Sequence, residues 1–375
     1  MPIFWLMLIT TGLFAFLFEL VCEAKSVRSA DPQSYKTIRA LLLISLSTVI
    51  FFASMRSVVS DTMAYTRMFA AIPTTMDQFF GYVRSQSKDP VFWAASMLFK
   101  CLISDNYHVW FFAITAICTY LLTSTIAKYS QMPFLSIVLF LLTCNFTWLF
   151  NGMRQFLAAC IVFYAYRYLI DGNLKKYVVG ILVASMVHAS AIIALPVYFI
   201  VRGEPGNIKM IAAAICSLIF ISALAKVLPF LNDVLSDSGY SEVITQFASD
   251  DGVNPVRIMI ALMPFAIYLI RKGKVDEQVP PFIRTSLNLS LLSSLIYLVG
   301  KFTSGIYVGR LPIYFEMINL ILYPWLFNQC FGKRDRMFVL LVFLLFYFLY
   351  FYYQMVISWD GFGYVSDVLG ISLRG

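Results

Sequence analysis

Residues 151–196 read NGMRQFLAACIVFYAYRYLIDGNLKKYVVGILVASMVHASAIIALP, and this stretch decides the fold class of the chain. Two apolar runs follow each other here, joined by the short polar segment DGNLKK (171–176). An apolar run of about 20 residues is long enough to cross the hydrocarbon core of a membrane as a helix. Arg154 nevertheless stands at the start of the first run, and His188 stands in the middle of the second. Ionisable groups are costly at such positions, so these two residues are the first candidates for a functional role.

Similar apolar runs recur along the whole chain of 375 residues, which is 60% hydrophobic and only 13% charged. A soluble domain of this length needs more charge to cover its surface. We therefore predict an all-α polytopic membrane protein, a single integral membrane domain over 1–375, with about 11 transmembrane helices. The first run lacks a basic start and is long, so we expect a retained helix rather than a cleaved signal peptide. The expected helices cover 3–22, 37–55, 107–126, 133–150, 152–170, 176–201, 208–231, 255–271, 285–303, 311–330 and 337–358.

The basic residues predict the orientation of these helices, because cytoplasmic loops are enriched in lysine and arginine. Lys25, Arg28, Lys36 and Arg39 follow the first helix, which places that loop inside and the N-terminus outside. Alternation then makes 56–106 an external loop. Its segment 89–103 is too short to span and is expected to form an amphipathic helix at the interface. The net charge of +8 thus follows from membrane topology and does not indicate nucleic-acid binding.

The run 176–201 decides the orientation of the second half of the chain. If it crosses the membrane fully, the basic loops 271–284 and 332–336 both face outside, against the usual charge bias. If it is broken or re-entrant, with His188 near its turn, both loops face inside. The loop 232–254, which contains acids but no lysine or arginine, then lies outside. We therefore predict a broken or re-entrant element here and place His188 in a cavity, because non-helical backbone at membrane depth must be buried in protein or line a wet space.

Other common chemistries find no support in the sequence. Seven cysteines without a CxxC motif predict free thiols, and two histidines exclude a multi-histidine metal site, so we expect no metal and no cofactor. The motifs GxxxxGK[ST], HExxH and GxSxG are absent, which argues against an ATP-driven protein, a zinc protease and a serine hydrolase.

Three arginines fall near the outer membrane edge in this topology. Arg56 ends the second span, whereas Arg154 and Arg310 begin later spans. The helix dipole disfavours a cation at a helix N-terminus, so Arg154 and Arg310 do not stabilise their helices. Guanidinium groups bind phosphate in bidentate geometry, and a helix N-terminus adds to an anion site. Two interpretations are open: the arginines hold an anionic substrate, or each one snorkels to lipid headgroups.

His188 and Asp61 are the two candidates for a general base. A histidine titrates near neutral pH and suits proton transfer or phosphate binding, although it can also be a hydrogen-bonded core residue. Asp61 lies four residues before Tyr65, so both share one face of a helix, and Asp61 is equally suited to be the N-cap of that helix. We expect the neighbouring Ser190 to be a capping or hydrogen-bonding partner.

Arg310 and Tyr314 repeat the spacing of Asp61 and Tyr65. Glu316 lies off the face that Arg310 and Tyr314 share, and it can pair with a basic residue inside the bundle.

Several motifs, taken in order, resemble the EpsG-type branch of the Wzy polysaccharide polymerases over about residues 50 to 325. The most specific combination is Asn-x-x-Arg-Gln at a helix start, followed by His-x-Ser-Ala. Asp89 stands where the family often has glutamate, and the tail SWDGFGYVSDVLG (358–370) matches no family pattern. The motifs are Arg56 with DTMAYTRMF (61–69), DPVFWAASMLFK (89–100), NGMRQFLAA (151–159), HASAIIALP (188–196) and RLPIYF (310–315).

The resemblance implies a metal-independent glycosyltransferase of GT-C-like architecture in the bacterial inner membrane, with its active site facing the periplasm. Such an enzyme moves a growing glycan from undecaprenyl pyrophosphate to the non-reducing end of a second lipid-linked repeat unit, in exopolysaccharide, capsule or O-antigen synthesis. The expected partners are these lipid-linked oligosaccharides, the bilayer, a chain-length regulator and a flippase. The implied catalytic residues are His188, Asp61, Arg154 and Arg310, and the implied substrate-binding residues are Arg56, Tyr65, Asn151, Gln155, Ser190, Tyr314 and Glu316.

Two other functions are compatible with the same polar residues. A flippase or other transporter of lipid-linked oligosaccharides needs a polar cavity with arginines, but it typically shows matched halves, which the sequence lacks. The other alternative is an O-antigen ligase or a membrane acyltransferase, of which the ligase shares the donor chemistry and differs only in its acceptor.

Overall fold

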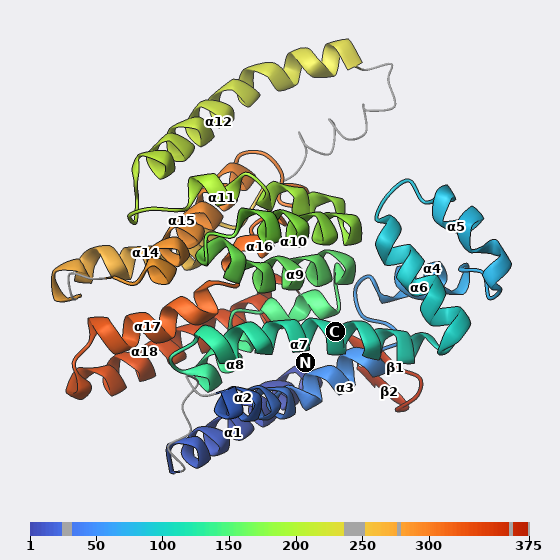
Figure 1. Ribbon diagram of the computed structural model, residues 1–375, viewed down its shortest axis with the longest axis horizontal. Helices are drawn as coiled ribbons and strands as arrows, with labels where there is room; N and C mark the ends of the chain where they lie inside the picture. The colour runs from blue at the N-terminus through green and yellow to red at the C-terminus, as the bar shows by residue number, and fades with distance from the viewer. Residues whose placement is uncertain (25–31, 236–251, 276–278, 360–362, 374–375) are drawn as a thin grey trace.

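The computed structural model describes residues 1–24, 32–235, 252–275, 279–359 and 363–373, which form a bundle made almost entirely of helices (Figure 1). The all-α class is therefore confirmed. Residues 236–251, most of the predicted outer loop 232–254, lie outside the described residues, as do Lys25 and Arg28.

The N-terminal helices pack against the middle of the chain. In Figure 1, α1, α2 and α3 lie along one edge of the bundle, where α1 contacts α8, and α2 and α3 contact α7. The apolar runs predicted over 37–55 and 133–150 are each broken into two pieces. The bounds are α1 (Pro2–Ala24), α2 (Pro32–Ser45), α3 (Ser47–Met55), α7 (Tyr107–Tyr129), α8 (Pro133–Leu142) and η2 (Asn145–Leu149).

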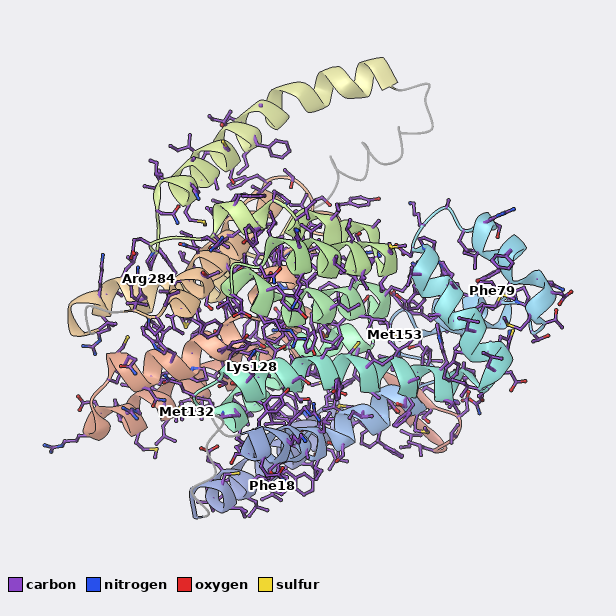
Figure 2. The ribbon with its side chains drawn as sticks, viewed as in Figure 1. Phe18, Phe79, Lys128, Met132, Met153 and Arg284 are labelled. Carbon is purple, nitrogen blue, oxygen red and sulfur yellow. The ribbon has the colours of Figure 1, made fainter. Side chains whose placement is uncertain are left out.

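The rest of the bundle is built from neighbouring antiparallel helices. The strongest pairs are α9 with α10 and α14 with α15, while α17 packs against α8 and α14. Apolar side chains fill the space between these helices (Figure 2). The bounds are α9 (Met153–Ile170), α10 (Leu174–Val187), η3 (Ala189–Ala194), α11 (Val197–Ile200), α12 (Ile208–Leu235), α14 (Pro255–Arg271), η4 (Lys272–Lys274), α15 (Pro281–Lys301), α16 (Ile313–Glu316), α17 (Asn319–Cys330), α18 (Lys333–Tyr352) and the π-helical turn η5 (Tyr353–Ser358).

The chain is a multi-pass membrane protein. By length and apolar composition, four described helices could each cross a membrane, and the bent pair α2–α3 makes a fifth. Large apolar side chains are exposed on α1, α12 and α18, as expected where helices meet lipid. The expected number of about 11 spans is not reached by unbroken helices, because breaks divide several of the predicted runs.

The element predicted over 176–201 is broken at His188. The helix α10 ends at Val187, and the backbone of His188 is extended, with φ −152° and ψ 116°. The chain then turns back along α10: the Tyr177 hydroxyl donates to the carbonyl of Ala194 at 2.6 Å, and the Tyr198 hydroxyl donates to that of Gly172 at 2.6 Å. The segment 174–200 is therefore a hairpin that returns to the end of the bundle from which it started.

The hairpin packs closely because a glycine faces its neighbour. A Cβ on Gly180 of α10 would lie 2.8 Å from the Cβ of Ala165 on α9. Close approach of small residues is the usual way in which helices associate in membranes, because lipid removes the hydrophobic driving force between them.

The two basic loops lie at the same end of the bundle, as the charge pattern requires. The guanidinium carbon of Arg271 lies 4.8 Å from the centre of the Phe331 ring, and Arg284 at the start of α15 pairs with Glu204. Arg336 donates to Asn328, which in turn bonds to Gln131. We call this the basic end, and we call the opposite end, which contains Asp89, Arg154 and Arg310, the site end.

A small lobe stands at the site end, on the right in Figure 1. The helix expected over 89–103 is present here as α6, with Phe92, Trp93 and Met97 buried. Lys100 of α6 connects this helix to the end of α4. Its ammonium group donates to the backbone carbonyls of Phe69, Ala70 and Ile72. The bounds are α4 (Thr62–Ala70), η1 (Met76–Gln78), α5 (Phe79–Ser85) and α6 (Pro90–Leu102).

The C-terminal tail, which matches no family pattern, forms an antiparallel hairpin of β1 (Tyr364–Ser366) and β2 (Ile371–Leu373). Val365 pairs with Val58 just after α3, and the Tyr364 hydroxyl donates to the carbonyl of Phe52 at 2.9 Å. The tail is therefore attached to the site end.

Candidate functional site

Asp89, Arg154 and His188 meet at the site end, although they come from three separate parts of the sequence. One carboxylate oxygen of Asp89 accepts from Nη1 of Arg154 at 2.8 Å and from Nδ1 of His188 at 3.2 Å. The other oxygen accepts from the backbone amide of Ala189 at 3.0 Å. Only 3% of the Asp89 side chain is exposed, whereas 23% of Arg154 and 27% of His188 are exposed. We call these three side chains the Asp89 cluster.

The hydrogen bond to Asp89 fixes the chemistry of His188. An ionised carboxylate can only accept hydrogen bonds, so Nδ1 of His188 is the nitrogen that bears the proton. In the neutral form of the ring, the other nitrogen, Nε2, carries the lone pair that a general base uses. Orientation of a histidine by a buried carboxylate is the arrangement that general-base catalysis uses.

Backbone geometry brings the members of the cluster into place. Asp89 has left-handed backbone geometry with φ 57°, and the proline after it begins α6. The helix α9 begins after Gly152, whose φ of 76° suits glycine, and a Cβ there would lie 3.0 Å from the ring of Trp148. The break after α10 frees the amide of Ala189 from the helix and directs it to Asp89.

The pKa of Asp89 lies below its ordinary value. Burial alone would raise it, but the hydrogen bonds from His188 and from the amide of Ala189, with the charge of Arg154, outweigh burial. A carboxylate with a lowered pKa stabilises the fold above its unfolded pKa of about 3.9, and this contribution is lost as the pH falls through the lowered value.

This linkage predicts how acid affects an Asp89→Asn variant. We expect the wild-type protein to melt at a higher temperature than the variant at neutral pH, and the difference to shrink below about pH 4. Thermal melts in detergent across this range measure it, with Asp77→Asn, an exposed carboxylate in the same lobe, as the control. A difference that stays constant from about pH 6 to about pH 3 would contradict the ionised state of Asp89.

Aromatic rings surround Arg154. Its guanidinium carbon lies 5.3 Å from the centre of the Trp93 ring and 6.0 Å from that of Tyr65, within the range of cation–π contact. The backbone amide of Arg154 also donates to the Tyr65 hydroxyl at 3.4 Å. The Nε of Arg154 is buried without a hydrogen-bond partner among the described residues, which leaves one donor unused.

Hydrogen bonds link the Asp89 cluster to Arg310. Ser190 lies two residues after His188, and its hydroxyl forms a hydrogen bond of 2.8 Å with the hydroxyl of Tyr314. The side-chain amide of Gln155, the residue after Arg154 on α9, donates to the carbonyl of Arg310 at 3.2 Å. The predicted residues Gln155, Ser190 and Tyr314 therefore lie along this connection, whereas Tyr65 contacts Arg154.

Arg310 lines an open pocket of about 360 Å³ at the site end. Asn151, from the turn before α9, lies on the same wall, and its side-chain oxygen is buried without a hydrogen-bond partner among the described residues. A second arginine, Arg257 of α14, also lines this pocket. We call it the arginine pocket; its lining residues are Thr147, Trp148, Asn151, Arg257, Gly305, Ile306, Arg310 and Trp359.

Arg56 does not reach either feature. It is fully buried, and its guanidinium donates to the carbonyl of Ala53, to the Thr62 hydroxyl and to the sulfur of Met153. Its guanidinium carbon lies 4.0 Å from the centre of the Phe111 ring. These contacts satisfy the charge inside the protein, and the physical role of Arg56 is to join α3 to α4 and α9.

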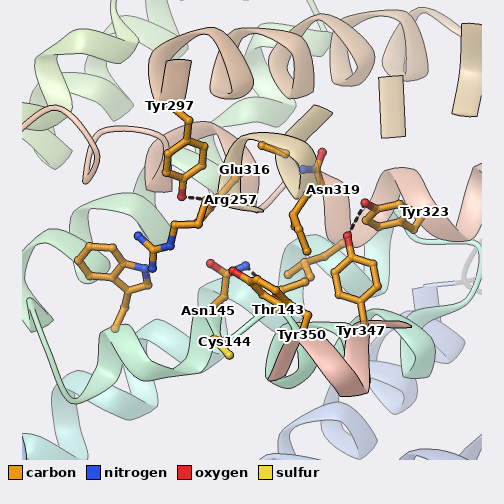
Figure 3. A pocket seen from close by; sticks show the side chains of 14 residues that line it. Thr143, Cys144, Asn145, Arg257, Tyr297, Glu316, Asn319, Tyr323, Tyr347 and Tyr350 are labelled. Carbon is orange, nitrogen blue, oxygen red and sulfur yellow. Dashed lines mark hydrogen bonds between the residues drawn. The ribbon is translucent and has the colours of Figure 1, made fainter. Parts of the chain in front are cut away.

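Asp61 and Glu316 lie apart from the Asp89 cluster. Asp61 occupies the N-cap position of α4, but its side chain makes no capping hydrogen bond, and no described hydrogen bond or ion pair joins it to the cluster. Glu316 accepts from the Tyr297 hydroxyl at 2.7 Å and lines a small cavity that it shares with Arg257 (Figure 3).

Two residues of this region were missed by reasoning from the sequence. Asp89 appeared only as a departure from a motif, and its signal was an acid directly before a proline and an apolar helix. Arg257 repeats the sequence pattern of Arg154, because Asn254-x-x-Arg257 near the start of α14 has the same spacing as Asn151-x-x-Arg154 near the start of α9.

Comparison with known proteins agrees with the resemblance in the motifs. The EpsG family model matches residues 39–366, a range that includes the Asp89 cluster and the arginine pocket. No curated protein and no solved structure matches the chain.

Proposed function

The chain belongs to the EpsG family, and from this premise we propose that it polymerises lipid-linked oligosaccharide repeat units at the site end. The family indicates a membrane-embedded polysaccharide polymerase in general terms. The finer proposal is that a growing glycan is transferred from undecaprenyl pyrophosphate to the non-reducing end of an incoming lipid-linked unit. The site end would face outward, because the basic loops gather at the opposite end.

The reaction needs a base for the acceptor and a stabiliser for the leaving group. The acceptor hydroxyl oxygen forms a bond to the anomeric carbon of the donor sugar, and the bond between that carbon and the phosphate oxygen breaks. The lipid pyrophosphate leaves with the electron pair. His188 takes the proton of the acceptor hydroxyl at Nε2, while Asp89 holds its ring and stabilises the charge that it gains.

In this proposal, arginine side chains bind the pyrophosphate. Arg310 and Asn151 line a pocket that is large enough for a diphosphate, and Arg154 adds a partly exposed guanidinium group from the Asp89 cluster. Guanidinium groups that face the departing oxygen stabilise charge that develops in the transition state. Holding two lipid-anchored substrates side by side supplies further acceleration through proximity.

The observation that carries the proposal is that an oriented histidine lies beside a pocket with arginines at one end of the bundle. The contacts Ser190–Tyr314 and Gln155–Arg310 connect the two. A base beside an anion pocket suits glycosyl transfer from a diphosphate donor.

An arginine-to-lysine exchange tests the proposed pyrophosphate binding. We expect Arg310→Lys and Arg154→Lys each to lower polymer formation by about tenfold or more, because lysine keeps the charge but loses the bidentate fork. Polymer length on gels measures the effect, and immunoblots of membranes check insertion. Arg84→Lys, an exposed residue of α5, is the matched control. Near-normal polymer from both variants would show that these arginines only anchor the chain to lipid headgroups.

A further inference from the structure

Arg257 stands between two spaces at the site end. One is the arginine pocket of about 360 Å³, and the other is a small cavity of about 40 Å³. Both are lined by Arg257 and by Trp148. Figure 3 shows Arg257 and Glu316 close together in this region, with Tyr297 above them. The side chain of Arg257 can therefore contact groups in both spaces.

The small cavity contains a carboxylate that needs a positive partner. Glu316 accepts a hydrogen bond from Tyr297, and the cavity is otherwise lined by neutral groups and by Arg257. Asn319, which is 8% exposed, has a side-chain oxygen that is buried without a hydrogen-bond partner among the described residues. Arg257 is the cation that lines this cavity, and it balances the charge of Glu316 across it. No ion pair closer than 4 Å joins the two among the described residues.

The helix does not explain the position of Arg257. It lies in the first turn of α14, where the helix dipole disfavours a cation. The capping of this helix is already supplied by Asn254, whose side chain accepts from the amide of Val256 at 2.9 Å. The guanidinium carbon of Arg257 lies 6.0 Å from the centre of the Trp359 ring, which also lines the arginine pocket.

We propose that Arg257 is a second cation for the donor diphosphate in the arginine pocket, and that Glu316 is the fixed counter-charge that positions it. The inference rests on the proposed function. Together, Arg257 and Arg310 give the pocket a positive charge for each of the two phosphoryl groups of a lipid diphosphate. Glu316 lowers the repulsion between the two guanidinium groups when the pocket is empty.

The test compares single and double charge removal in the full-length, detergent-purified protein, with inorganic pyrophosphate as the probe. The single variant Arg257→Gln leaves Glu316 without its counter-charge, so this variant can lose pyrophosphate binding because it misfolds. The double variant Arg257→Gln with Glu316→Gln removes both charges and restores a neutral cavity. We expect the double variant to melt as the wild-type protein does but to bind pyrophosphate about 10- to 100-fold more weakly, because hydrogen bonds to a charged group are lost.

Arg67→Gln, an exposed arginine of α4 at the same end, is the control and should bind as the wild type does. If the double variant binds pyrophosphate as tightly as the wild type, Arg257 serves only to balance Glu316, and the inference is overturned. In that case a loss of binding in Arg310→Gln would still support the proposed function. Absence of pyrophosphate binding in the wild-type protein would overturn both.

Discussion

An Asp89→Asn variant is expected to form polymer about 10²- to 10⁴-fold more slowly than the wild type while it still inserts and folds. Three donors point at this carboxylate, from Arg154, His188 and the amide of Ala189. An asparagine presents one oxygen and one NH₂ group, so it can no longer accept from all of them. The side chain keeps its size, so the loss of activity comes from the missing charge and hydrogen bonds and not from a change of shape.

The main consequence of this change falls on His188. Arg154 and His188 donate to the same oxygen of Asp89, so the amide oxygen of asparagine would take that place and the ring would keep its proton on Nδ1. A neutral amide, however, cannot stabilise the positive charge that the ring gains when Nε2 takes a proton, and the base would be weakened. Initial rates with purified protein measure this effect, and Asp77→Asn controls for the loss of a nearby negative charge. A rate within about twofold of the wild type would show that Asp89 only stabilises the fold.

The second large effect is expected for His188→Gln. We expect a loss of about 10²- to 10⁴-fold, similar to that of His188→Ala. The glutamine amide can donate to Asp89 in place of Nδ1, so the cluster keeps its hydrogen bond, but an amide cannot accept a proton at neutral pH. The comparison therefore separates the role of base from the role of hydrogen-bonding partner.

The variant Asp61→Asn completes this experiment, since Asp61 is the other residue proposed as the general base. If His188→Gln polymerises normally and Asp61→Asn does not, the roles of the two residues are reversed. The position of Asp61 at the start of α4, without a described contact to the Asp89 cluster, is the reason to expect the opposite result.

The sequence predicts the elements of this fold better than their breaks. Apolar runs locate nearly every helix, and the charge of the loops indicates the hairpin around His188. The breaks in other runs depend on tertiary contacts: Cys144, for example, adopts a left-handed backbone with φ 61° between α8 and η2, which no residue preference favours. The tail gave no pattern because its short strands pair with a partner near Val58, more than 300 residues away.

The candidate site shows the same division between local and distant information. Arg154, His188, Gln155, Ser190 and Tyr314 were found because ionisable or polar groups stand out in apolar runs. The link through Asp89 could not be predicted, because Asp89 lies 65 residues before Arg154 and 99 before His188. Arg56 drew attention for its charge alone, whereas its partners are a carbonyl, a hydroxyl, a sulfur atom and aromatic rings that no charge pattern reveals.

The most direct test of the central claim is the product formed by the purified protein alone. The protein would be reconstituted with undecaprenyl-pyrophosphate-linked repeat units, and the glycans would be resolved by length on a gel. Polymerisation predicts a ladder that advances by one repeat unit per step and that disappears in His188→Gln. A single transfer to a different lipid acceptor would identify a ligase, and movement of intact units across the vesicle membrane without a ladder would identify a transporter. Either result would contradict the account.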